Sequence, residues 1–284
     1  MHSHFSFNRM FLYTFLVVLT IMCFTPFYMM MINATRSSPD ISTGFALLPD
    51  SMNQMMANYN RMQSIINIWR GLFNSFVITV PYVLISSYFS ALTAWGFTFY
   101  RFKGRNILFM IVIGTMMIPP QLGLIGYNEM MIFLGNTTGY SFRDNWISLW
   151  FPAFFTGASV FFLRQYMIAA IPYEIVESCR MDGAGELAIF HRVVIPLSMP
   201  SIATMGIFTF VYAWNNYLTP LILLDTQDIY PVSLLISTLR NTAYGHELGA
   251  IYLAIAISVL PILFAFVFLS RYIINGISAG AVKG

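Results

Sequence analysis

Long apolar stretches alternate with short polar segments along the whole chain. Six of the stretches approach the roughly 20 residues that a helix needs to cross about 30 Å of hydrocarbon. They are Met10–Ile32, Leu72–Phe99, Asn106–Leu134, Ile147–Ile171, Leu197–Leu224 and Leu248–Ile274. The pattern therefore predicts an all-α, polytopic membrane protein with six transmembrane helices.

The polar segments divide the chain into three parts. Residues 1–34 are expected to form a first transmembrane helix, because their apolar run is too long for the core of a signal peptide and no cleavage site follows it. Residues 35–70 are rich in Asn, Ser and Met and are expected to form an external loop that is long enough for a small helix. Residues 71–284 hold the remaining five helices.

Composition excludes a soluble domain. Charged residues make up 9% of the 284 residues and apolar residues 58%, whereas about 25% of a soluble domain is charged. The net charge of +3 is small and the arginines are scattered, so no nucleic-acid partner is expected. The two cysteines, Cys23 and Cys179, fall in a span and in a polar segment, so neither a disulfide nor a metal site is expected.

Lysine and arginine set the orientation, since they are retained preferentially on the cytoplasmic side. With the N-terminus inside, nine of these 14 residues fall in cytoplasmic segments and five in external ones. The short segment Arg101–Arg105 contributes most to this difference. Both termini are therefore expected in the cytoplasm.

Prolines interrupt several of the predicted spans. The strongest interruption is Pro119-Pro120, which is followed directly by Gln121. Inside a membrane, a freed backbone carbonyl is tolerated only against protein or a water-filled cavity. The break therefore marks either an ordinary kink or part of a polar path, and Gln121 is a candidate for lining that path.

A second polar cluster, Trp214-Asn215-Asn216-Tyr217, falls inside the fifth predicted span. Two adjacent amides cannot both face lipid without a desolvation cost. Amides between aromatic rings are suited to binding sugars, because they bond hydroxyl groups while a ring stacks on the sugar. Asparagines also join membrane helices to one another, and the sequence leaves both interpretations open.

The polar segment after the fourth span has the features of a short helix followed by a turn. Pro172 suits a first helical turn, and Asp182-Gly183 supplies residues that end a helix. Between them, Glu174, Glu177 and Arg180 accompany a few apolar residues. We predict an amphipathic helix at the membrane surface, which either lies there alone or serves as a docking lever for a soluble partner.

The spacing in this segment resembles a known motif. Glu177-Ser178-Cys179 is followed by three residues, Gly183, nine residues and Val193-Val194-Ile195-Pro196. This resembles the EAA loop of binding-protein-dependent ABC importer permeases, with the pattern Glu-Ala-Ala, three residues, Gly, nine residues, Ile-x-Leu-Pro. Ser178 and Cys179 replace the alanines, and Val193 and Ile195 replace Ile and Leu.

The resemblance extends over most of the chain and is closest to the smaller permease subunit of maltose-type carbohydrate importers. Further matches are Leu134–Thr137, Phe162–Gln165 and the ending Gly276–Gly284. The resemblance implies a type I importer permease fold in a bacterial cytoplasmic (inner) membrane, with 172–197 as a cytoplasmic coupling loop. Its coupling residues would be Glu174, Glu177, Arg180, Asp182, Gly183 and Pro196, and its C-terminal tail would reach the ATPase pair.

The resemblance also implies partners: a second, homologous permease subunit, two cytoplasmic ATPase subunits that hold ATP and Mg²⁺, and an external solute-binding protein. This chain itself has no Gly-Lys-Ser/Thr run that could bind phosphate, and its histidines form no H-E-x-x-H motif that would build a metal or hydrolytic site. We therefore expect a transport subunit without cofactor or enzymatic activity. The alternatives are a stand-alone secondary carrier or channel, and a membrane-embedded scaffold.

Overall fold

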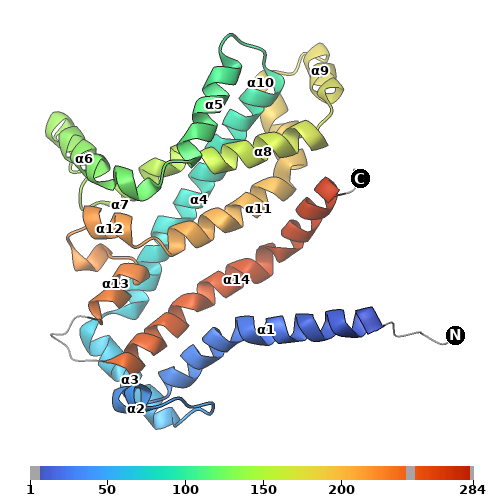
Figure 1. Ribbon diagram of the computed structural model, residues 1–284. Coiled ribbons are helices and arrows are strands. Elements are labelled where there is room, and N and C mark those ends of the chain that lie inside the picture. The colour runs from blue at the N-terminus through green and yellow to red at the C-terminus, as the bar shows by residue number, and fades with distance from the viewer. Residues whose placement is uncertain (1–6, 241–246, 282–284) are drawn as a thin grey trace. The chain divides into compact units, whose positions relative to one another are not determined.

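The computed structural model describes residues 7–240 and 247–281. Every regular element in these ranges is a helix (Figure 1). The chain divides into two compact units, of which unit 1 comprises Met1–Ile68 with Leu235–Leu260 and unit 2 comprises Trp69–Leu234 with Pro261–Gly284.

Five helices are long and apolar enough to cross a membrane: Arg9–Ala34, Ile68–Phe99, Trp146–Ala170, Glu186–Trp214 and Leu248–Val267. The pair Arg105–Met116 and Pro120–Thr138 meets the same criteria jointly but is bent by 95°. With this pair counted as one broken span, the described residues contain the six spans that the sequence predicts.

The helices follow one another along the chain with short connections. Their bounds are α1 (Phe7–Ala34), α2 (Ser38–Thr43), α3 (Met52–Ile65), α4 (Ile68–Phe99), α5 (Arg105–Met116), η1 (Pro120–Gly123), α6 (Leu124–Thr138), α7 (Trp146–Trp150), η2 (Phe151–Phe155), α8 (Gly157–Ala170), α9 (Tyr173–Met181), α10 (Glu186–Ile189), η3 (Phe190–Val194), α11 (Ile195–Trp214), α12 (Leu218–Leu223), η4 (Gln227–Ile229), α13 (Val232–Thr238) and α14 (Leu248–Ala281). The tail resemblance at Gly276–Gly284 falls on the end of α14, and residues 282–284 lie outside the described ranges.

The polar segment 35–70, expected to be an external loop long enough for a small helix, contains two helices, α2 and α3, and the first residues of α4. Buried polar contacts hold α3 against the connection between α1 and α2 within unit 1. The Asn58 amide donates to the carbonyl oxygens of Ala34 and Arg36 at 2.9 and 3.0 Å. Gly249, in the first turn of α14, fits here because any side chain would meet the Arg36 carbonyl oxygen.

Unit 2 is organised along α4. Near the C-terminal end of α4, Trp95 packs in a buried apolar cluster with residues from α8, α9 and η3. Nearer its N-terminal end, Ile78 packs with Leu149 and Leu223. Between these clusters, the hydroxyl of Thr156 bonds those of Ser86 and Ser90 at 2.9 and 2.7 Å. Such small hydroxyl residues let membrane helices approach closely.

The Pro119-Pro120 break is confirmed, and it divides the third predicted span sharply. Pro119 is extended (φ −59°, ψ 123°) and separates α5 from η1. The reason is that proline disfavours helical backbone in the residue before it, so Pro120 prevents α5 from continuing through Pro119.

The predicted start of the fifth span at Leu197, directly after Pro196, is wrong. The helix already begins at Glu186 and runs continuously to Trp214. Proline normally clashes with the carbonyl four residues before it. Here the preceding turn is π-helical, and the Ile195 N–H donates to the carbonyl of Phe190. This wider turn accommodates the proline inside the helix.

The predicted end of the fifth span at Leu224 is also wrong. The long helix stops at Trp214, and a separate short helix, α12, follows. Pro220 lies in the first turn of α12, where its missing N–H is not needed. The carbonyl of Asn216, which a continuous helix would bring against Pro220, instead accepts a hydrogen bond from the Ser233 hydroxyl at 2.8 Å.

Candidate functional site

The element with the EAA-like spacing forms a helix and a turn, as predicted. α9 follows extended Pro172 (φ −58°, ψ 137°). At its end Gly183 adopts φ +79°, and its N–H donates to the Arg180 carbonyl at 3.0 Å. The next N–H, of Ala184, donates to the Cys179 carbonyl at 3.0 Å. This pair of bonds is the Schellman ending, which requires a left-handed residue and favours glycine.

One face of α9 is packed against the body of unit 2. Val176 is completely buried, and it lies in one cluster with Ile189 and Phe190 from the following helix. Phe190 stacks on Trp95 of α4, with ring centroids 5.2 Å apart. Through this cluster, α9 is seated on a spanning helix.

The opposite face of α9 is open. Glu174 and Glu177 are exposed, and Met181 is 87% exposed. Asp182 is exposed at the end of the helix. An exposed methionine between acidic residues gives this face both an apolar contact and negative charge.

A polar latch, which we define as Arg180, Glu186 and Tyr100, closes the turn. The Arg180 guanidinium donates two hydrogen bonds to the Glu186 carboxylate, at 2.8 and 3.2 Å. The Tyr100 hydroxyl donates to the same carboxylate, and Arg180 also lies over the Tyr100 ring. Burial and then Glu186 raise the pKa of Tyr100 to about 12, so the hydroxyl remains a donor at neutral pH.

The sequence singled out Arg180 but missed Glu186 and Tyr100. Glu186 lies six residues beyond Arg180 on a different helix, so no helical spacing links the two side chains. Tyr100 comes from the end of α4, 86 residues before Glu186. Only the fold brings these three groups together.

A cavity of about 420 Å³, with a largely apolar lining that includes three amide side chains, lies between the η1–α6 region and the α11–α12 break. It gathers four of the five predicted path residues, Gln121, Asn215, Asn216 and Tyr217. Gln121 and Asn215 are both exposed. The other lining residues are Pro120, Leu124, Val211, Tyr212, Leu218 and Thr219.

Trp214 differs from the other predicted path residues. It is buried and stacks on Phe210, with ring centroids 5.5 Å apart, and it does not line the cavity. Asn216 has a partly structural role, because its amide oxygen accepts from the Thr219 N–H at 3.3 Å at the start of α12. Among residues 7–240 and 247–281, the Asn215 side chain hydrogen-bonds only within its own turn, to the Val211 carbonyl at 2.9 Å, and Asn215 lines the cavity.

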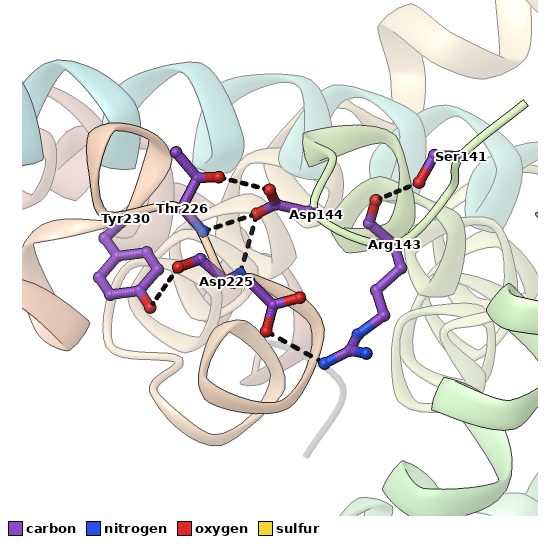
Figure 2. A network of polar contacts seen from close by, with 6 residues as sticks. All are labelled: Ser141, Arg143, Asp144, Asp225, Thr226 and Tyr230. Atoms are coloured by element: carbon purple, nitrogen blue, oxygen red, sulfur yellow. Dashed lines mark hydrogen bonds and ion pairs between the residues drawn. The ribbon is translucent and has the colours of Figure 1, made fainter.

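A clamp centred on Asp144 joins two loops at another edge of unit 2 (Figure 2). Asp144 has a left-handed backbone (φ 55°). Its carboxylate accepts from the N–H groups of Asp225 and Thr226, at 2.8 and 2.9 Å, and from the Thr226 hydroxyl at 2.5 Å. Arg143 pairs with Asp225 at 3.0 Å.

The environment shifts the titration of Asp144. Partial burial on its own would raise the pKa of Asp144, but the hydrogen bonds from Thr226 and Asp225 and the charge of Arg143 outweigh it and lower the pKa. The carboxylate is therefore charged at neutral pH and holds the two loops together. No local pattern predicts this clamp, because its two sides lie about 80 residues apart in the sequence.

No group of three or more His, Cys, Asp or Glu side chains that could hold a metal ion occurs among residues 7–240 and 247–281. The polar features that remain are the exposed face of α9, a cavity beside a broken span and a loop clamp. Together with the spans, they define a multi-pass helical membrane protein that presents a short amphipathic helix, α9, at its surface.

Comparison with known proteins places the chain in a family. Residues 5–279 match the family described as "Binding-protein-dependent transport system inner membrane component", so the chain belongs to this family of transport permeases. The EAA-like resemblance is thereby confirmed at the level of the family.

Several relatives are similar over much of their length. The arabinooligosaccharides transport system permease protein AraQ of Bacillus subtilis is 29% identical over 100% of this chain and 99% of its own. The corresponding protein of Halalkalibacterium halodurans is 33% identical over 76% of this chain and 75% of its own. The sn-glycerol-3-phosphate permease protein UgpE of Escherichia coli is 28% identical over 74% of this chain and 72% of its own.

A solved structure shares the fold. A bacterial ABC transporter involved in importing the acidic polysaccharide alginate contains a chain that matches with a TM-score of 0.76 and 23% identity. The match covers 96% of this chain and 100% of that one. The importer permease fold predicted from the sequence is therefore confirmed.

Proposed function

We propose that this chain is a permease subunit of an ATP-driven ABC importer for a sugar or oligosaccharide. Three observations support the substrate class: relatives named for arabinooligosaccharides and for alpha-glucosides, the fold shared with a polysaccharide importer, and the amide-lined cavity. A sugar offers many hydroxyl groups, which amides and a stacked ring recognise together.

The observation that carries the coupling role is the way α9 is mounted. Val176 and the latch fix one side of α9 to α4, while Glu177 and Met181 stay exposed on the other. A partner that pushes on the exposed side would therefore move a spanning helix rather than a loose loop. In this scheme Glu177 contacts the ATPase, and Asp182-Gly183 form the fixed corner.

The energy source lies on other chains. Two cytoplasmic ATPase subunits would bind ATP and Mg²⁺ and dock on α9, consistent with the lack of a Gly-Lys-Ser/Thr run in this sequence. A second, homologous permease subunit would complete the path as a heterodimer, and an external binding protein would deliver the solute. The whole assembly would sit among the lipids of the bacterial cytoplasmic membrane, with both termini of this chain inside.

The cavity gives the substrate hypothesis a direct test. Asn215→Ala and Gln121→Ala each remove an amide that lines the cavity. Asn215→Ala also removes the hydrogen bond from this amide to the Val211 carbonyl at the end of α11, so Gln121→Ala is the cleaner of the two variants. In proteoliposomes holding the complete importer, we expect each of these variants to raise the KM for sugar uptake roughly fivefold, since each removes a hydrogen bond of about 1 kcal/mol. The stacked Trp214→Phe is the matched control, because Trp214 does not line the cavity.

The same proteoliposomes test the class of transporter. Uptake should require the ATPase subunits and the binding protein. A stand-alone carrier or channel would instead transport sugar when this chain is reconstituted alone. Unchanged KM values in both amide variants would contradict the cavity as the sugar path without contradicting the ATP dependence.

A further inference from the structure

A basic cavity lies in the connection between α4 and α5. It has a volume of about 420 Å³ and is lined by Arg101, Phe102, Gly104, Arg105, Asn106 and Ile107. We infer that this cavity binds the phosphate of an anionic phospholipid headgroup, a role that is separate from sugar transport.

The first argument is uncompensated charge. Arg101, Lys103 and Arg105 lie within five residues, and no Asp or Glu occurs between Asp50 and Glu129. The three ion pairs found among the described residues lie elsewhere. The Glu186 carboxylate, which accepts a hydrogen bond from Tyr100, is already paired with Arg180. Positive charges this close repel one another, and an anion bound among them would offset that repulsion.

A fourth cation, Arg164 of α8, adds to this positive charge. Arg164 and Arg105 interact by charge repulsion. The Arg164 guanidinium is held in place over the Phe109 ring, 4.1 Å from its centroid, and donates to the Phe97 carbonyl at 3.4 Å. It therefore cannot swing away to relieve the repulsion without losing these contacts.

The second argument is that the cavity is already shaped. Gly104 has a left-handed backbone (φ 83°) and turns the chain into α5. The Arg105 guanidinium donates to the Tyr100 carbonyl at 3.1 Å, which holds it against the turn. No side chain caps the start of α5. The Arg105 N–H donates to the Phe102 carbonyl at 3.3 Å, which leaves the next N–H groups of the first turn, those of Asn106 and Ile107, available to the same anion.

The third argument selects a lipid over a free anion. Phe102 and Ile107 beside the arginines are 44% and 62% exposed. The connection joins α4, a spanning helix, to α5, the first half of the broken span, so it lies at the membrane surface. A phospholipid satisfies both features, because its phosphate meets the arginines and its acyl chain covers the apolar side chains. Basic sites beside spanning helices bind anionic lipids in this way.

The test is lipid retention by the full chain, purified with any permease and ATPase partners that accompany it. Native mass spectrometry would count bound lipid after incubation with phosphatidylglycerol or phosphatidylcholine. We expect preferential retention of phosphatidylglycerol and a loss of roughly tenfold in R101Q/R105Q. R192Q removes an exposed arginine outside the cavity and should retain phosphatidylglycerol like the parent.

A single variant and a second ligand keep the test decisive. R101Q changes an exposed side chain and should itself weaken retention if the double variant does not fold. Equal phosphatidylglycerol retention by the parent protein and R101Q would overturn the proposal. So would a thermal stabilisation by inorganic phosphate that R101Q abolishes without any change in lipid retention, since the site would then take a free anion.

Discussion

At the scale of single residues, Gly183 holds the backbone conformation on which the end of α9 depends. Its φ of +79° is accessible to glycine at no steric cost. A β-carbon added at this position would meet no atom within 4 Å. Position 183 therefore favours glycine because of its backbone dihedral angle, and not because a side chain would lack space.

Gly183→Pro should abolish transport while the protein stays in the membrane. Proline fixes φ near −65° and lacks the N–H that bonds the Arg180 carbonyl, so the Schellman ending cannot form. Uptake in cells and the amount of protein in the membrane fraction would be measured together. Gly185→Ala is the control, because φ at Gly185 is −68° and alanine accepts that value. Uptake at the parental rate in Gly183→Pro would contradict the lever.

The latch leads to a second prediction at this scale. Glu186→Gln removes the charge that Arg180 bonds, but leaves an amide oxygen in place. Because both side chains are partly exposed, we expect a loss of only about 0.5–1 kcal/mol. This should be seen as a few-fold faster amide hydrogen exchange in α9 and a lower ATPase rate per sugar-loaded binding protein.

Glu174→Gln serves as the control for the latch. Glu174 lies on α9, the helix whose exchange is measured, and its carboxylate has no hydrogen bond or ion pair among the residues that the structure describes. If both variants accelerated exchange equally, the effect would come from the helix charge and not from the latch.

These residues show what a sequence can reveal about a site. Gly183 and Pro172 were predictable because turn chemistry is local and reads directly from residue type. Gln121 and Asn215 were predictable as polar groups in apolar surroundings. Glu186 and Asp144 were not, because their meaning comes from partners on other elements. An exposed carboxylate in a loop looks the same in sequence whether it closes a clamp or faces water.

At the scale of elements, the apolar runs predicted which segments form helices, but they did not predict where those helices begin and end. Pro196 looked like a helix start and instead lies within a continuous helix, since a π-turn accommodates it. Asn215-Asn216 looked like part of a span and instead forms its end. In both cases the position of the helix end depends on which carbonyl groups the residues beside the proline can bond. Tertiary packing determines those partners.

The Asp144 clamp gives a prediction for the two loops as a unit. Asp144→Asn keeps a residue that tolerates a left-handed backbone but loses the charge that accepts three hydrogen bonds. We expect a stability loss of about 1–2 kcal/mol at neutral pH, measured as a lower Tm in detergent. Asp228→Asn, in the neighbouring turn, is the matched control.

The pH dependence of this loss has a definite sign. Because the pKa of Asp144 is lowered in the folded protein, its stabilisation is complete above its ordinary pKa, near 3.9. It disappears as the pH falls through the lowered value. The Tm difference between the parent and Asp144→Asn should therefore be constant from pH 7 to about 5 and shrink in stronger acid. A difference that grew on acidification would contradict the assignment.

At the scale of the whole molecule, α4 separates the two polar ends of unit 2. The contacts of Asn74 with the 228–230 loop lie near one end of this helix, and the seat of α9 on Trp95 lies near the other. At 1.5 Å per residue, these positions are roughly 30 Å apart, which is the thickness of the hydrocarbon core. The loop clamp and the lever should therefore lie on opposite faces of the membrane.

Cysteine labelling tests this arrangement together with the orientation. In a background with Cys23 and Cys179 replaced by serine, Met181→Cys reports on the lever and Tyr140→Cys on the opposite end; the parent side chains are 87% and 46% exposed. A membrane-impermeant maleimide should label Tyr140→Cys in intact spheroplasts and Met181→Cys only after permeabilisation. The bias of Lys and Arg toward the segments on the lever side predicts this direction. If Met181→Cys were labelled from outside, α9 could not dock on cytoplasmic ATPase subunits. If both sites were labelled from one side, the two ends of α4 would not lie across the bilayer.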